Sequence, residues 1–148
     1  MILISHRGNI NGPQPELENS PEYIEAALNA GYEVEIDVIY QDGWWLGHDE
    51  PEYEIEYGFL CRSDLWVHCK NMEAFANLNF IHHGVGGINY FWHQEDDYTL
   101  TSTGYIWTYP GKKMIHGSNA IIVKPEINKQ DISNFVGVCS DYIANYGD

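Results

Sequence analysis

Short runs of apolar and β-branched residues, separated by turn-forming residues, divide the chain into eight predicted strands. They cover residues 2–5, 33–40, 44–48, 65–70, 88–93, 105–110, 120–125 and 137–143. Gln41-Asp42-Gly43 is a glycine-bearing turn, so residues 44–48 are predicted to fold back on residues 33–40 as a hairpin. The other strands are then candidates for one main sheet.

Helix signals are fewer than strand signals. Ser20 and Pro21 provide a cap and a first-turn proline before an alanine-rich segment that Gly31 closes. A second short helix is predicted over residues 71–78, and a third within residues 125–135. The order strand, helix, strand near the start of the chain indicates parallel βαβ units and therefore an α/β fold.

Composition narrows the classes of partner. The 148 residues fit one domain, residues 1–148, and 44% of them are hydrophobic, as in a globular protein. With 22 acidic residues against 7 Lys+Arg the net charge is −15, which argues against nucleic acid and against anionic membrane surfaces. A phosphorylated substrate would need a cation to offset the repulsion.

The cysteines and the hydropathy of the chain indicate the cellular compartment in which the protein resides. Cys61, Cys69 and Cys139 are odd in number and lack metal-knuckle spacing, so we expect no disulfide framework and a reducing environment. The apolar start of the chain is too short for a signal peptide, and no run reaches the length of a membrane span. We expect a cytoplasmic protein without membrane insertion.

The strand predicted over residues 33–40 alternates in polarity. Glu33, Glu35 and Asp37 share one face, and valine and isoleucine residues share the other. One interpretation is an acidic face exposed to solvent. In the other, Glu35 and Asp37 lie one pleat apart and share a hard divalent cation such as Mg²⁺ or Ca²⁺.

Two further features carry candidate chemistry. On residues 65–70, His68 and Lys70 share a face, which indicates either a solvated surface or a site for a metal and an anion together. His6, followed by Arg7, ends the first strand, and His48 ends the hairpin strand. Two imidazoles on either side of a cation suit acid/base chemistry, and arginine suits phosphate.

These motifs resemble, in their order, those of the glycerophosphodiester phosphodiesterase family. The matching motifs are His6-Arg7-Gly8, Glu18-Asn19-Ser20, Glu35-Ile36-Asp37, Asp42-Gly43 and His48-Asp49. Val67-His68-Cys69-Lys70 is similar to the third strand of the family, and Gly137-Val138-Cys139-Ser140-Asp141 is similar to its closing strand. The match is dense over residues 3–50 and loose over residues 71–136.

The resemblance implies a TIM-type barrel whose site lies at the carboxyl ends of the strands. It implies that His6 and His48 are the catalytic acid/base pair and that Glu35 and Asp37 are metal ligands. His68 stands where the family has a third carboxylate ligand, so we expect it to be the third metal ligand. An imidazole there could shift metal preference from Mg²⁺ or Ca²⁺ toward Mn²⁺ or Zn²⁺.

The resemblance also implies that Arg7 and Lys70 contact the substrate phosphate and that Glu18 braces Arg7. Because (β/α)₈ barrels rarely have fewer than about 200 residues, the fold class we expect is a minimised or incomplete TIM-type (β/α) barrel with about seven barrel strands and few helices. Strands without outer helices would leave apolar patches, so we also expect a homo-oligomer.

The function implied is metal-dependent hydrolysis of a glycerophosphodiester, a small-molecule phosphodiester substrate, to an alcohol and glycerol phosphate. Two alternatives stay open: a non-catalytic module that binds glycerol phosphate, and a phospholipase-type activity on lysolipid or sphingolipid head groups. No catalytic role is assigned to the remaining histidines, which are His82, His83, His93 and His116. His93, at a strand end, could line the substrate pocket, but a structural role is favoured for it.

Overall fold

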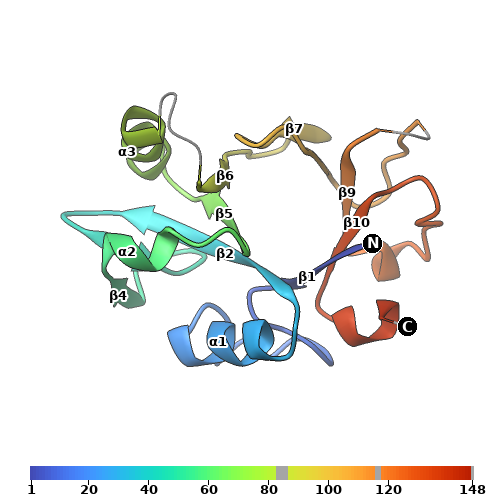
Figure 1. Cartoon of the computed structure of the whole chain (residues 1–148), viewed down its shortest axis with the longest axis horizontal. Helices are drawn as coiled ribbons and strands as arrows, with labels where there is room; N and C mark the ends of the chain where they lie inside the picture. Colours follow the sequence, from blue (N-terminus) through green and yellow to red (C-terminus); the bar gives the residue numbers. More distant parts are fainter. Residues whose placement is uncertain (83–86, 116–117, 148) are drawn as a thin grey trace.

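A mixed β-sheet of ten strands forms the body of the protein in the computed structural model, which describes residues 1–82, 87–115 and 118–147 (Figure 1). The strands are β1 (Ile2–His6), β2 (Glu33–Tyr40), β3 (Trp44–Leu46), β4 (Tyr53–Ile55), β5 (Leu65–Cys69), β6 (Asn89–Phe91), β7 (Tyr98–Leu100), β8 (Ile106–Thr108), β9 (Ala120–Val123) and β10 (Gly137–Ser140). The α-helices are α1 (Pro21–Asn29), α2 (Tyr57–Leu60) and α3 (Met72–His82), and two 3₁₀ turns cover Pro125–Ile127 and Ile143–Tyr146.

Seven of the described strands run parallel to one another, in the order β8-β9-β10-β1-β2-β5-β6. The other three are antiparallel: β3 pairs with β2, β4 with β3, and β7 with β8. The predicted hairpin is therefore confirmed. Figure 1 shows the sheet curving around a central space, with α1, α2 and α3 outside it.

The predicted minimised or incomplete TIM-type (β/α) barrel is wrong. The described chain is a mostly β protein, because a helix does not follow each parallel strand and antiparallel strands interrupt the alternation. The physical reason is the length of the links. Residues 109–119 and 124–136 join β8 to β9 and β9 to β10, and such links are close to the shortest that a crossover helix needs. The third predicted helix is reduced to a 3₁₀ turn at Pro125–Ile127.

The first predicted helix is confirmed together with its cap. Ser20 has extended backbone, and its Oγ accepts a hydrogen bond from the backbone N–H of Tyr23 at 3.3 Å. Pro21 occupies the first helical position, where its missing N–H costs nothing. Ile24 and Ala27 then turn inward and pack, fully buried, against the sheet.

The two faces of the sheet bury different residues. One face packs against the helices through a large cluster that includes Val34, Ile36 and Val67. The opposite face holds Trp66, Phe91 and other buried side chains. The buried hydrophobic cluster on this opposite face consists of Ile4, Trp66, Phe91, Trp107, Ile121, Val123 and Cys139. Large aromatic side chains thus fill the space that the curved sheet encloses.

Irregular chain covers the outer side of β9 and β10. Phe135 and Ile143 pack with Ala120, Ile122 and Val138 in a third buried cluster. The exterior of these two strands is therefore covered without a long helix, which removes part of the reason to expect a homo-oligomer. The oligomer stays a prediction.

One backbone hydrogen bond and several side-chain hydrogen bonds, rather than a regular strand ladder, link β6 to the segment that follows β7. The backbone N–H of Ser102 donates to the carbonyl of Tyr90 at 2.9 Å, and Ser102 Oγ accepts from the N–H of Tyr90 and donates to the carbonyl of Ile88. Thr103 Oγ1 also bonds to the side chain of Asn89 at 2.7 Å. We refer to these contacts of residues 101–103 with β6 as the seam of the sheet.

None of the helices in the described part of the chain has the length and apolarity needed to cross a membrane. Cys61, Cys69 and Cys139 are all free, as expected from their number and spacing.

Replacing Ser20 with Ala should lower the free energy of unfolding by about 1 kcal/mol, because the N–H of Tyr23 would lose its capping partner. Urea unfolding followed by tryptophan fluorescence measures the change. Ser20→Thr, which keeps a capping oxygen, is the matched control and should lose much less. Equal losses in the two variants would contradict a capping role for the hydroxyl.

Candidate active site

Polar side chains meet where the parallel strands β1, β2 and β5 approach their carboxyl ends. His6 ends β1 and is in register with Glu35 of β2, and Asp37 is in register with His68 of β5. A cavity of about 480 Å³ opens here. Its charged side includes His6, Arg7, Glu35, His48, His68, Lys70 and Lys124, and Trp92, Trp107 and Tyr109 are among its aromatic residues.

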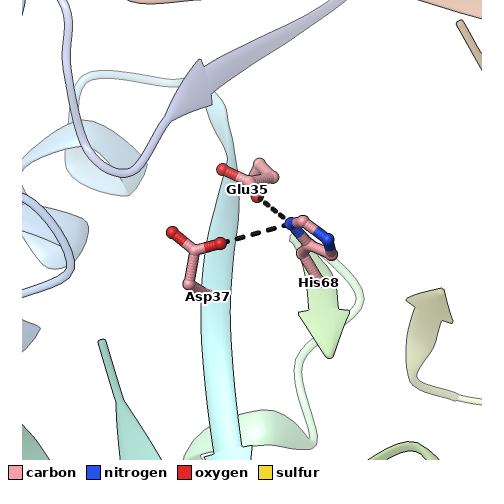
Figure 2. A group of neighbouring side chains, drawn as sticks. All are labelled: Glu35, Asp37 and His68. Carbon is pink, nitrogen blue, oxygen red and sulfur yellow. Dashed lines mark ion pairs between the residues drawn. The ribbon is translucent and has the colours of Figure 1, made fainter. Parts of the chain in front are cut away.

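Glu35, Asp37 and His68 form a buried cluster at the base of the cavity. His68 Nδ1 lies 3.5 Å from Glu35 Oε1 and 3.2 Å from Asp37 Oδ1 (Figure 2). Because Glu35 is 2% exposed and Asp37 is 0% exposed, the interpretation of an acidic face in solvent is wrong for these two residues. One ligand atom from each of the three residues lies within 4.8 Å of the others, a spacing that a metal ion can bridge.

The cluster has the free donor atoms that a divalent cation needs. Glu35 Oε2 and Asp37 Oδ1 are buried and make no hydrogen bond of good geometry among the described residues. Buried polar atoms normally have such a partner, so carboxylate oxygens beside only the imidazoles of His6 and His68 and the more distant Lys70 Nζ are consistent with a cation site. The residues present therefore fit a divalent metal.

The other oxygen of Asp37 is fully engaged. Asp37 Oδ2 accepts from Asn19 Nδ2 at 3.0 Å and lies 2.7 Å from Arg7 Nε. Asn19 Oδ1 in turn accepts from the backbone N–H of Asp37 at 2.9 Å. Lys70 Nζ approaches Asp37 Oδ1 at 3.8 Å. This buried carboxylate is thus surrounded by donors and positive charge.

These contacts shift two pKa values in opposite directions. Burial would raise the pKa of Asp37, but the hydrogen bond with His68 and the charge of Arg7 outweigh it and hold the pKa well below its usual range. Burial opposes a charge on His68, yet its hydrogen bonds with Asp37 and Glu35 outweigh burial and raise its pKa. Without a metal, the protein itself neutralises the cluster.

Arg7 lies on a tight turn after β1. Its φ of 56° is in the left-handed region, and Gly8 follows with φ 94°. A Cβ on Gly8 would lie 2.6 Å from the Tyr23 ring, which explains the glycine. Arg7 Nη1 donates to Glu18 Oε2 at 3.2 Å. Arg7 therefore lines the cavity while two of its nitrogens face carboxylates.

His6 is held by a carboxylate from the far end of the chain. Its Nδ1 donates to Asp141 Oδ1 at 2.7 Å, and its Nε2 lies 3.8 Å from Glu35 Oε2. An ionised carboxylate only accepts hydrogen bonds, so the proton of a neutral His6 is on Nδ1 and the lone pair on Nε2. Asp141 also contacts Lys124 Nζ at 2.8 Å and Asn9 Nδ2 at 2.9 Å.

His48 reaches the same cavity from the loop after β3. Gly47 begins this loop, and its N–H donates to the carbonyl of Asp37 at 3.1 Å. A Cβ on Gly47, whose φ is 154°, would lie 2.0 Å from the carbonyl oxygen of Glu50, so the loop requires glycine. The His48 side chain is 40% exposed, and its Nδ1 donates to Asp49 Oδ1 at 2.7 Å.

Every predicted catalytic, metal and phosphate-binding residue lines the cavity or belongs to the cluster, and Glu18 contacts Arg7 from behind. No role was predicted for Asp141, Lys124 or Asn19, and His93 was predicted only as a residue that could line the pocket. Two of these residues could have been predicted from the sequence, because Asn19 lies inside a motif of the resemblance and Asp141 follows the strand that pairs with β1. Lys124 carried no such signal.

The remaining histidines without an assigned role differ in placement. His93 lines the cavity, and burial together with the neighbouring His68 lowers its pKa to about 4, so it is neutral. His82 ends α3. His83 and His116 lie outside the described residues.

Comparisons with protein-family models, with curated proteins and with solved structures find no match. The function is therefore argued from the site itself.

Replacing Asp141 with Asn should destabilise the protein at pH 7 by about 2 kcal/mol, because charge-assisted hydrogen bonds are lost. Burial would raise the pKa of Asp141, but its hydrogen bonds to His6 and Lys124 hold the pKa well below its usual range. The folded state therefore favours the carboxylate, and this contribution is present above the ordinary value of 3.8 and lost as pH falls below it.

Urea unfolding of the wild type and Asp141→Asn at several pH values from 7 to 3 measures this effect. The difference between the two proteins should shrink on acidification. A difference independent of pH would show that the carboxylate charge does not contribute.

Proposed function

We propose that the protein is a metal-dependent phosphodiesterase that cleaves a glycerophosphodiester-type substrate into an alcohol and glycerol phosphate. One observation carries the proposal. A single cavity holds a buried Glu35-Asp37-His68 cluster together with two histidines, His6 and His48, each paired with a carboxylate. Metal donors and a base–acid pair in one cavity are what in-line displacement at phosphorus requires.

The substrate phosphate must enter a strongly negative protein. Glu35, Asp37 and His68 would hold the divalent cation, which polarises a phosphoryl oxygen and offsets charge when it is bound. Lys70, Lys124 and Arg7 add positive side chains to the wall of the cavity. These residues bind and orient the phosphate, and the aromatic part of the wall can accept the organic substituent.

His6 is suited to the role of general base. Asp141 holds the proton on Nδ1 and leaves the Nε2 lone pair beside Glu35, inside the cavity. His6 would remove a proton from the nucleophile, either water or a neighbouring hydroxyl of the substrate. The nucleophile's oxygen then forms the new bond to phosphorus.

His48 is suited to the role of general acid. Asp49 accepts a hydrogen bond from its Nδ1 and orients the ring, and the Nε2–H of a protonated imidazole can donate. As the bond between phosphorus and the alcohol oxygen breaks, His48 would protonate that oxygen and release the alcohol. With water as nucleophile, the balance is diester plus water to alcohol plus phosphomonoester.

The resemblance to the glycerophosphodiester phosphodiesterase family supports the same assignment. Residues from its separate motifs, far apart in the sequence, line one cavity: His6, Glu35, His48 and Lys70. The lack of an alternating (β/α) barrel concerns the scaffold, whereas function depends on the site.

The test is hydrolysis of a panel of glycerophosphodiesters by metal-stripped protein to which Mg²⁺, Ca²⁺, Mn²⁺ or Zn²⁺ is returned. We expect metal-dependent release of glycerol phosphate. His6→Ala and His48→Ala should each lower the rate about 10²–10⁴-fold, the usual contribution of a general acid or base. Lys112→Ala, which removes an exposed cation paired with Asp97, is the surface control and should retain the rate.

The pattern of failure separates the alternatives. Metal and glycerol phosphate binding without turnover would indicate a non-catalytic binding module. Turnover confined to lysolipid or sphingolipid substrates would indicate the phospholipase-type activity. Full turnover in both histidine variants would contradict the two-histidine mechanism.

A further inference from the structure

We propose that the Glu35-Asp37-His68 site selects a first-row transition-metal cation, with Zn²⁺ as its representative, over Mg²⁺ and Ca²⁺. The selection comes from His68 Nδ1, which faces both carboxylates while two parallel rings pack against the imidazole. This inference shares one assumption with the proposed function, namely that the cluster is the metal site. It adds the class of metal that the site binds.

The atoms that could bind the metal include one imidazole nitrogen and only a few carboxylate oxygens. His68 Nδ1 is the ring atom that faces both carboxylates, at 3.2 Å from Asp37 and 3.5 Å from Glu35. Imidazole nitrogen suits Zn²⁺, Fe²⁺ and similar cations, whereas Mg²⁺ and Ca²⁺ prefer oxygen. Three protein ligands beside an open cavity also match the ligand count of catalytic zinc sites.

Asp37 can offer only one oxygen. Its Oδ2 is held by Asn19 Nδ2 and Arg7 Nε, so Oδ1 alone is left for a cation. Calcium takes six to eight oxygen ligands and commonly uses bidentate carboxylates. Bidentate binding by Asp37 would break two contacts of a fully buried group, which disfavours a cation of high coordination number.

The His68 ring packs against two rings parallel to it, Phe91 of β6 and His93 two residues after β6, whose own centroids are 6.1 Å apart at 8°. Phe91 lies with its ring centroid 5.1 Å from that of His68, at an interplanar angle of 7°. His93 lies on His68 at 4.6 Å and 1°. Parallel rings so close leave His68 little freedom to rotate, and its Nδ1 stays directed at the carboxylates. His93 is therefore a positioning residue for the metal ligand.

The experiment measures metal affinity and ligand identity on the full chain, freed of metal by chelation. Calorimetry and competition with an indicator should show Zn²⁺ binding at least roughly 100-fold tighter than Mg²⁺ or Ca²⁺. Pulsed EPR of the Mn²⁺-loaded protein should show nitrogen coupling that changes when histidine is labelled with ¹⁵N. This spectrum needs no variant, so it tests the proposal whether or not any variant folds.

Variants then assign the nitrogen to one residue. His68→Gln should lose the coupling and weaken Zn²⁺ binding by more than roughly 100-fold, and His68→Asp should reduce the preference for Zn²⁺ over Mg²⁺. His48→Gln changes a histidine of the same cavity outside the cluster, so it should keep both the coupling and the affinity.

The ring contacts have their own matched pair of variants. His93→Ala removes one of the two rings that pack against His68 and should weaken Zn²⁺ binding about 10-fold, whereas His93→Phe keeps a ring there and should retain the affinity. Equal loss in both variants would overturn the positioning role and assign a direct interaction to the His93 nitrogens.

Failure of this inference is distinguishable from failure of the proposed function. Equal affinities for Zn²⁺ and Mg²⁺, or no nitrogen coupling, would overturn the inference even if diesters are hydrolysed. Tight, nitrogen-ligated Zn²⁺ binding would support the inference even if no diester is hydrolysed.

Discussion

Asp37 has no exposed surface, and an ionised carboxylate in that position must be compensated on every side. Asn19 binds both its backbone N–H and its side chain, Arg7 meets one oxygen, and His68 meets the other. Satisfying this one group brings together the loop before α1, the turn after β1 and the end of β5. The arrangement of the candidate site follows from that requirement.

Compensation of Asp37 also explains the unusual backbone around it. Arg7 and Asn19 both adopt positive φ, at 56° and 63°, conformations that cost a non-glycine residue free energy. They are bonded to each other as well, since the N–H of Asn19 donates to the carbonyl of Arg7 at 3.1 Å. The strain is local, and the contacts that surround a buried charge maintain it.

Local patterns in the sequence predicted the local structure well. The alternation over residues 33–40 predicted β2 with its observed bounds, and the turn at Gly43 predicted the hairpin of β2 and β3. The capping residue Ser20 predicted the start of α1. What failed was the global scaffold, because strand signals alone cannot state whether the links between strands are helices or irregular chain. Residues 109–119 and 124–136 are irregular apart from a 3₁₀ turn, in their described parts.

The sequence predicted those residues of the candidate site that lie in contiguous motifs. It did not predict the contacts between residues far apart in the chain. His6 and Glu35 stood out by residue type and position, whereas the bond from His6 to Asp141 joins residues 135 positions apart. No local periodicity encodes such a contact. The exposure of the acidic face was also undecidable from alternation alone, because a buried metal site and a solvated strand give the same pattern.

The seam between β6 and residues 101–103 has a consequence for how the cavity exchanges its contents. Ladder hydrogen bonds join the parallel strands elsewhere. At the seam, the link consists of one backbone hydrogen bond and the hydrogen bonds of the Ser102 and Thr103 hydroxyls. Regions with fewer backbone bonds open at lower free energy. Thr99 Oγ1 also donates to the carbonyl of Trp92 at 3.3 Å, and both residues line the cavity, so separation of the chain at the seam would move this wall of the cavity.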